Sequence, residues 1–187
     1  MRQIVGSVEG EFRRYKALAE GAIDQLTDEQ LSRADGAGDN SVAILMAHVS
    51  GNLVSRFTDF LTTDGEKPWR DRDTEFVAGK ADRAELRERW ESAFTVLFGA
   101  LAALDDGQLH TAVTIRGVGY SVHEALHRAL AHVSYHVGQI VFVAKALRGD
   151  GWRHLSIPPG GSASYNQDPV REKPPAATGT APPKRTP

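Results

Sequence analysis

Apolar residues recur at steps of three and four along most of the chain, the spacing that places them on one face of an α-helix. This pattern predicts four long helices that span approximately residues 4–26, 41–61, 82–104 and 121–147. Each helix has a single apolar face, and packing the four faces around a shared interior would bury all of them. The predicted fold is therefore all-α, a four-helix bundle.

Capping residues support the limits of two of these helices. Asp82 with Glu85, and Ser121 with Glu124, have the three-residue spacing of a capping box, in which each side chain bonds a free backbone N–H of the first turn. Gly149 follows the last apolar position of the fourth helix and is typical of a helix stop. The third and fourth helices are thus expected to begin near these pairs.

Three connections interrupt the helical pattern. Thr27–Gln30 has capping-box spacing, but the glycine-rich residues 35–40 follow it, so we expect a short turn and then a loop. Residues 66–80 carry charges of both signs and predict a solvated connection. Residues 111–120 are rich in β-branched residues and glycine, which would suit a hairpin, but one short strand cannot make a sheet. The sequence therefore predicts a long loop between the third and fourth helices.

The composition changes after Pro158. Two prolines and two glycines in Ile157–Asn166 predict an irregular C-terminal segment rather than another helix. Residues 169–187 are rich in proline and small polar residues and cannot bury a core, so we expect a disordered tail. The predicted organisation is one domain over residues 1–168, followed by this tail over residues 169–187.

Composition narrows the functional classes. The chain has 187 residues, 41% of them hydrophobic and 25% charged, and its net charge of -2 gives no reason to expect a nucleic-acid partner. There is no cysteine, so any metal would be held by nitrogen and oxygen ligands. No window approaches the roughly 18 apolar residues that span a membrane, and the first residues lack the apolar stretch of a signal peptide. The expected location is the cytoplasm, with no membrane partner.

Three histidines are the strongest candidates for chemistry. His132 and His136 are four residues apart, so their imidazoles point the same way from adjacent turns of the fourth helix. Both lie among apolar positions, as does His48 on the second helix. Two facing helices can bring the three rings into one interior metal site, and three nitrogen ligands would leave coordination positions open, as in catalytic sites. The alternative is that each buried histidine simply donates to a backbone carbonyl.

The other four histidines are weaker candidates. His123 and His127 are also four residues apart, but His123 lies about 180° from His132 around the helix, so they are expected on the surface or at an interface. His110 falls in a loop and His154 near the tail, where a solvated role is the expectation.

Polar residues extend the histidine rows. Asn52 and Arg56 follow His48 at four-residue steps and would either line a pocket or form an exposed polar strip. Gln139 follows His136 by three residues and would bond either a ligand or a metal-binding side chain. These three are the candidate substrate-binding residues. No fourth metal ligand is evident, although three carboxylates are candidates to reach the site: Asp59, Glu75 and Glu124.

Longer stretches carry a family resemblance. The block AHVSGNLVSRFTDFLTTDGEKPW, the block ALAHVSYHVGQIVFVAKAL and the closing SIPPGGSASYN resemble the DinB-like superfamily of metal-binding four-helix bundles, over most of residues 1–168. Within it, GNLVSRFTDFLTTDGEK, HVSYHVGQI and the SIP segment are similar to a branch of unknown function. In the superfamily one histidine early in the second long helix and an HxxxH pair in the last hold the metal. The matching residues here are His48, His132 and His136.

The resemblance implies a divalent ion of the zinc or nickel type, a homodimer formed through helix faces, and a relation to bacillithiol-transferase-like proteins. Characterised relatives are transferases or isomerases that use a low-molecular-weight thiol. A shared fold does not transfer a reaction, so this activity is an expectation only.

Two classes of function follow. The first is a metal-dependent transferase in which the ion lowers the pKa of an external thiol, since the chain has no thiol of its own. Metal-assisted hydrolysis is a weaker enzymatic alternative, because no HExxH pattern supplies a general base: Val133 follows His132. The second class is a non-enzymatic metal-containing module that binds a small molecule or serves in a stress response.

Overall fold

The computed structural model describes residues 1–34, 40–77 and 82–169. These residues belong to two units, Met1–Arg153 and the segment from His154 onward, which are described separately. Most of the glycine-rich stretch and the predicted tail beyond residue 169 lie outside the described residues. No helix of the described part is long and apolar enough to cross a membrane.

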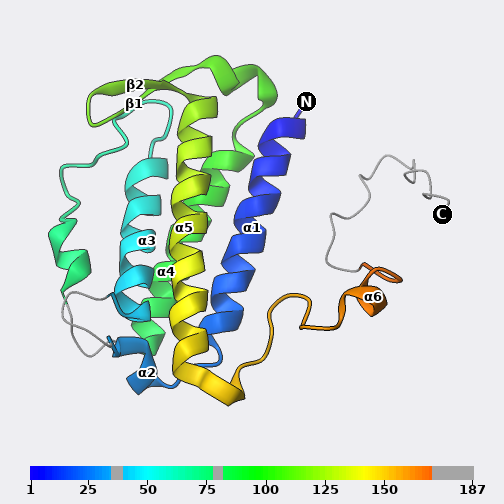
Figure 1. Cartoon of the computed structure of the whole chain (residues 1–187). Helices are drawn as coiled ribbons and strands as arrows, with labels where there is room; N and C mark the ends of the chain where they lie inside the picture. Colours follow the sequence, from blue (N-terminus) through cyan, green and yellow to red (C-terminus); the bar gives the residue numbers. More distant parts are fainter. Residues whose placement is uncertain (35–39, 78–81, 170–187) are drawn as a thin grey trace. The chain divides into compact units, whose positions relative to one another are not determined.

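The first unit is mostly helical, and its four long helices lie side by side (Figure 1). They are α1 (Gln3–Ile23), α3 (Val42–Phe57), α4 (Arg83–Ala102) and α5 (Val122–Arg148). Helix α3 packs against α4 and also against α5, while α5 packs against α1. The prediction of a mainly helical chain with four long helices is confirmed.

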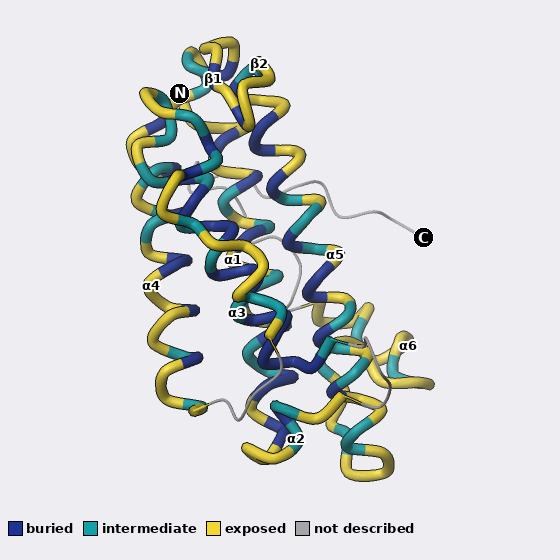
Figure 2. The backbone as a smooth tube through the Cα atoms, turned by 90° about the vertical axis from the view of Figure 1, so that its left-hand side faces the viewer, coloured by how far each residue is buried: buried dark blue, intermediate teal, exposed yellow. Residues whose placement is uncertain are grey.

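The apolar faces of these helices point inward, and the outer turns are exposed (Figure 2). Aromatic side chains contact one another in the interior: Phe12 of α1 meets Phe57 of α3 edge-on at 6.4 Å between ring centroids, and on α4 the ring centroids of Trp90 and Phe94 lie 4.8 Å apart. Burial of such side chains is the main stabilising term of a helical unit of this size.

Helix α3 is shorter than predicted. It ends at Phe57, whereas the apolar pattern extends to about residue 61. Thr58 is extended and Asp59 has a positive φ of 48°, which no helix interior adopts. The carbonyl of Asp59 accepts hydrogen bonds from the N–H groups of Thr62 and Thr63, so the chain turns here rather than continuing as a helix.

Helix α2 (Asp28–Ser32) stands where only a turn was predicted. Thr27 accepts from the Gln30 N–H and the Gln30 side chain accepts from the Thr27 N–H, which completes the capping box. Leu31 is buried against the interior. The capping box and the buried Leu31 together stabilise this single helical turn, which helix propensity alone would make only marginally stable.

A β-hairpin replaces the predicted long loop. Strands β1 (Ala112–Ile115) and β2 (Val118–Ser121) pair antiparallel through a two-residue turn of Arg116 and Gly117, both with positive φ. The Asp64 carboxylate accepts from both turn N–H groups at 2.8 Å. This remote acceptor, together with burial of Ile115, stabilises a hairpin that would be marginal in isolation.

A second remote acceptor caps α1. Arg2 occupies the N-cap position without a capping side chain, and the Asp106 carboxylate instead accepts from the N–H groups of Gln3 and Val5 at 2.7 and 3.0 Å, and from that of Ile4. Asp106 opens a short 3₁₀ segment, η2 (Asp106–His110). The end of α4 and the start of α1 are thereby joined.

Short helices complete the described chain. They are the 3₁₀ segments η1 (Asp73–Phe76) and η3 (Gly149–Gly151), and in the second unit the four-residue helix α6 (Ser162–Tyr165). The prediction that Ile157–Asn166 is wholly irregular was wrong at α6. Gly161 is followed by residues other than glycine and proline, and its carbonyl accepts from the Tyr165 N–H at 3.0 Å, so one turn closes.

Candidate metal centre

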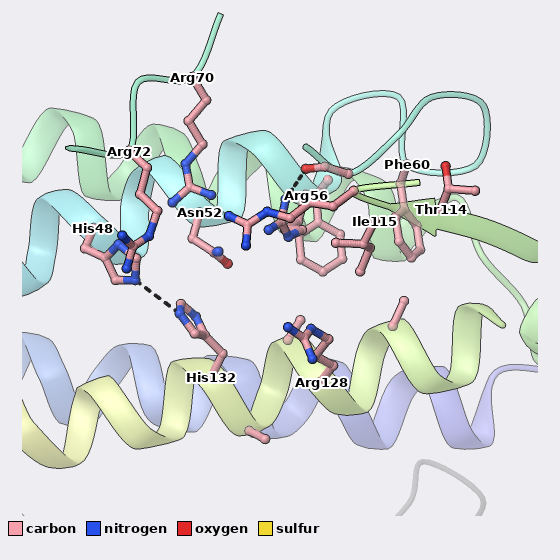
Figure 3. Close-up of a pocket in the computed structure, with 16 residues that line it drawn as sticks. His48, Asn52, Arg56, Phe60, Arg70, Arg72, Thr114, Ile115, Arg128 and His132 are labelled. Carbon is pink, nitrogen blue, oxygen red and sulfur yellow. Dashed lines mark hydrogen bonds between the residues drawn. The ribbon is translucent and has the colours of Figure 1, made fainter. Parts of the chain in front are cut away.

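Helices α3 and α5 bring three imidazoles together. His48 projects from α3, and His132 and His136 project from successive turns of α5. The Nε2 atoms of His48 and His132 lie 3.2 Å apart (Figure 3), and one ligand nitrogen of each histidine lies within 4.8 Å of the others. The three side chains are close enough to hold one metal ion. They are the same three residues that the sequence pattern groups.

The far nitrogens of two rings have fixed acceptors. His48 Nδ1 lies 2.9 Å from Glu75 Oε2, and His136 Nδ1 lies 2.7 Å from Gln139 Oε1. A carboxylate and an amide oxygen can only accept, so each Nδ1 carries the proton and each Nε2 presents a lone pair. The His48 lone pair lies 3.2 Å from His132 Nε2, and a ligand nitrogen of His136 lies within 4.8 Å of the other two rings' ligand nitrogens, so the three rings can share one cation.

The spacing of one pair of these nitrogens fits such a cation. Nitrogens held about 2.0 to 2.1 Å from a tetrahedral ion would lie roughly 3.3 Å from each other. The 3.2 Å between His48 and His132 is close to this value. His132 Nδ1 is buried without a hydrogen-bond partner among the described residues, so His132 is the least constrained ring of the three.

Burial keeps these rings in the form that binds metals. It lowers the pKa of His132 to about 3, with nearby His136 and His48 as further causes. Burial also lowers the pKa of His136, and the hydrogen bond to Gln139 opposes this shift. Only neutral imidazole offers a lone pair, so both residues are ligand-competent at neutral pH.

Glu75 belongs to the site, but its segment was wrongly predicted. Although burial raises its pKa, hydrogen bonds from His48 and Arg70 hold the pKa of Glu75 below its usual value. Arg70 donates from Nε and Nη2 at 2.8 and 2.9 Å, and only 3% of its side chain is exposed. The prediction that residues 66–80 form a solvated connection was wrong at these two positions, because they bury a paired carboxylate against α3. Glu75 contacts the far side of His48 and is not one of the grouped metal ligands.

A glycine on α3 makes room for Glu75. A Cβ on Gly51 would lie 2.8 Å from Glu75 Cδ and closer still to Oε1, so any larger residue would displace the carboxylate. Gly51 comes one helical turn after His48. A glycine inside a helix costs stability. Its position next to a buried histidine was the available signal that another chain segment approaches here.

A pocket of about 440 Å³ opens beside the histidines. His48 and His132 lie in its wall, and Asn52 and Arg56 line it, as one of the two sequence interpretations holds (Figure 3). Gln139 is not part of this lining, because it bonds His136 instead. The remaining wall is partly apolar, from Phe60 and neighbouring side chains, and partly cationic.

The other predicted residues lie elsewhere. Side chains of His110, His123, His127 and His154 are exposed, as expected. Glu124 serves the α5 capping box and Asp59 is exposed in the turn after α3. Among the described residues, no further group of three potential ligands lies as close together as the three histidines.

Comparison with known proteins identifies the family of the chain but no reaction that it catalyses. Residues 1–161 match the family model described as "Protein of unknown function (DUF1572)", and the chain belongs to this family. Searches of curated proteins and of solved structures found no match. The function must therefore be argued from the site itself.

Proposed function

For this member of the DUF1572 family, we propose a DinB-like four-helix bundle that binds one divalent ion, zinc or nickel, and acts as a transferase with a low-molecular-weight thiol. His48, His132 and His136 would hold the ion through Nε2. The observation that carries the proposal is the convergence of one ligand nitrogen from each of the three histidines beside an open pocket that His48 and His132 line, with the Nδ1 atoms of His48 and His136 already engaged.

The helix arrangement supports the structural part of the proposal. Helix α3 contributes the single histidine and α5 the pair, and these two helices pack against each other. Ligands from facing helices are the usual way in which a helical bundle builds an interior metal site.

Open coordination favours a reactive site over a purely structural one. Structural zinc sites have four protein ligands, whereas catalytic sites keep one position for water or substrate. Among the described residues the group contains three ligands, and the adjoining pocket is large enough for a small molecule. A bound ion would supply Lewis acidity that lowers the pKa of an incoming thiol.

The chain's own residues would orient this chemistry. Glu75 fixes the plane of His48, and Phe76 lies beside the same ring with 4.7 Å between centroids. Hydrolysis is less favoured, because it needs a carboxylate free to take a proton from water, and Glu75 is already bonded to His48 and Arg70. A non-enzymatic small-molecule-binding module is the remaining alternative.

Metal analysis tests the site. Wild-type protein purified without an affinity tag should contain about one equivalent of metal per chain, and His48→Ala and His132→Ala should each lose it. His123→Ala removes an exposed histidine from the same helix as His132 and should keep the metal. Metal retained by both site variants, or absent from reconstituted wild type, would refute the proposal.

A second experiment tests the reaction class. Cobalt-loaded protein should develop a sulfur-to-metal charge-transfer band when a thiol is added. It should also form a thioether from that thiol and an aryl halide, with release of halide and a proton, faster than the His132→Ala variant. A band without any turnover would favour the binding module, and an unchanged spectrum would exclude the thiol role.

The homodimer belongs to the same proposal. Tyr135 and Phe142 lie seven residues apart on α5, and they are 64% and 75% exposed, an unusual position for large apolar side chains. Sedimentation equilibrium should give twice the chain mass, and Phe142→Glu should give the monomer mass.

A further inference from the structure

The pocket beside the histidines has an unbalanced charge. Its lining includes five arginines and no carboxylate: Arg56, Arg70, Arg72, Arg116 and Arg128. They come from α3, the connection after it, the hairpin turn and α5, so no single local motif accounts for them. Figure 3 shows several of these guanidinium groups around the same space.

Nearby carboxylates neutralise only part of this charge. Glu66 Oε2 is shared by Arg56 and Arg116, each at 3.0 Å, and Glu75 pairs with Arg70. Arg128 has no carboxylate partner among the described residues; its guanidinium lies 5.9 Å from the centre of the Tyr120 ring. Arg72 lies 4.0 Å from Asp73, which is almost fully exposed and well screened. The described carboxylates therefore leave a cationic excess at the pocket.

One donor in this group is buried and unused. Arg70 Nη1 has no hydrogen-bond partner among the described residues, and Glu66 Oε2 is 4.0 Å away, too far for a hydrogen bond. Burial lowers the pKa of the Arg56 guanidinium; the hydrogen bond and charge of Glu66 oppose this shift, and the neighbouring charges of Arg70 and Arg116 add to it. A buried guanidinium donor without an acceptor is costly, so these residues favour an additional anion.

Two helical rows place the charge at a defined distance from the histidines. On α3, His48, Asn52 and Arg56 are spaced four residues apart. On α5, Arg128 precedes His132 by about one turn. With a rise of 1.5 Å per residue, Arg128 is about 6 Å and Arg56 about 12 Å along the axis from the histidine of its own helix. Among the five arginines, Arg128 and Arg56 are therefore one and two turns from the candidate metal.

We propose that this pocket binds the oxyanion of a small-molecule ligand, a carboxylate or phosphate, through Arg128 and Arg56. The proposal deepens and rests on the proposed function, because it assigns the ligand class of the same site: an anionic thiol whose acid group lies one to two helical turns from its sulfur. Guanidinium forks bind both kinds of oxyanion, and the part-apolar wall around Phe60 suits a carbon chain between the two ends.

Anion binding is tested first without any metal or thiol. Succinate and inorganic phosphate are titrated separately into metal-free protein and followed by calorimetry and amide NMR shifts. Wild type should bind at least one of them with shifts at the hairpin turn and α5, and which of them binds distinguishes a carboxylate from a phosphate site. Arg128→Met should weaken binding about tenfold or more. Arg14→Met, an exposed arginine of α1, is the matched control and should bind like wild type.

The thiol arm uses two probes of equal length, mercaptohexanoate and mercaptohexanol, with zinc-loaded protein. Wild type should prefer the anionic probe by at least about tenfold, and Arg128→Glu should remove or reverse this preference. Arg128 has no carboxylate partner among the described residues on which the fold would depend, and circular dichroism checks that the variant remains helical.

The three ways to fail are distinguishable. Equal binding of the two thiols together with no anion binding to metal-free protein would overturn the anion site while leaving the metal and thiol roles standing. Anion binding that depends on Arg128, in a protein that binds no metal or thiol, would refute the proposed function and keep the oxyanion site. Anion binding that is identical in Arg128→Met and wild type would also overturn the proposal.

Discussion

Two buried regions of the same helical unit are built on different principles. The aromatic cluster, which comprises the pairs Phe12–Phe57 and Trp90–Phe94, contains side chains that are at most 3% exposed, and apolar ring contacts join the members of each pair. The histidine cluster, which comprises His48, His132, His136 and Glu75, is also largely buried, but hydrogen bonds to Glu75 and Gln139 hold two of its three rings.

This difference separates two ways in which a residue contributes. In the aromatic cluster the side chains stabilise the fold by excluding water, and a substitution lowers the free energy of unfolding according to the side-chain volume that it removes. In the histidine cluster the Nδ1 atoms of His48 and His136 depend on one acceptor each, because a buried polar group without a partner costs free energy. We expect changes in the first region to alter stability, and changes in the second to alter metal affinity.

The largest effect is expected in the aromatic cluster. Phe94→Ala should lower the free energy of unfolding by about 3 to 5 kcal/mol, because it leaves a cavity beside Trp90. Urea denaturation followed by tryptophan fluorescence measures the change. The folded fraction should still bind about one metal per chain; loss of metal from folded protein would contradict the separation of the two regions.

Glu75→Gln should act mainly on metal binding. The glutamine keeps the shape but removes the charge that orients and polarises His48, and comparable changes next to metal ligands cost about 10- to 100-fold in affinity. Competition with a chromogenic chelator gives the affinity. Glu88→Gln alters an exposed carboxylate of α4 and should leave the affinity unchanged. An unaffected Glu75→Gln variant would remove Glu75 from the site.

The pH dependence of the metal-free protein tests the burial of the histidines. The folded pKa of His132 is lowered to about 3 from an ordinary value of 6.5, so between these values the unfolded chain binds more protons. The contribution of His132 to the free energy of unfolding should be fully present above about pH 6.5 and should fall as the pH is lowered toward 3. The loss should be on the order of 1 kcal/mol after allowance for solvent at the half-buried ring. Denaturation midpoints across this range measure it. His132→Asn should flatten the profile, and an equally steep profile in that variant would assign the effect to other groups.

The smallest change in stability is expected when two helical glycines are each replaced by alanine. Alanine is favoured over glycine in a helix by up to about 1 kcal/mol, so Gly10→Ala on α1, where a Cβ meets nothing within 4 Å, should stabilise the protein. Gly51→Ala should gain less, because its Cβ displaces Glu75, and should weaken metal binding about tenfold. Thermal denaturation and chelator competition give both quantities. Equal behaviour of the two variants would mean that Glu75 does not depend on Gly51.

Much of the helical framework was predictable because its signals are local. Apolar spacing identified the four long helices, and Ser41, Asp82 and Ser121 cap α3, α4 and α5 through their own side chains. The same periodicity placed His48 and the His132–His136 pair on inward faces, so helical spacing alone was enough to group the three candidate metal ligands.

Two features that the sequence did not reveal share a physical cause, which is dependence on residues distant in sequence. The hairpin turn needs Asp64, some 50 residues before it, and α1 is capped by Asp106, about 100 residues after it. Local sequence propensity predicts neither of these contacts. The end of α3 was missed for a related reason: the apolar pattern continues through Phe60 although the backbone turns at Thr58 and Asp59.

The sequence by itself determined the helices, their inward faces and the three histidines, because helical periodicity fixes which side chains share a face. Tertiary structure alone decided what surrounds those histidines. Glu75 and Arg70 lie in a connection without periodicity, and the arginines of the pocket come from four separate segments. Their convergence follows from how the segments fold onto α3 and α5, and only that packing sets the charge and the orientation of the site.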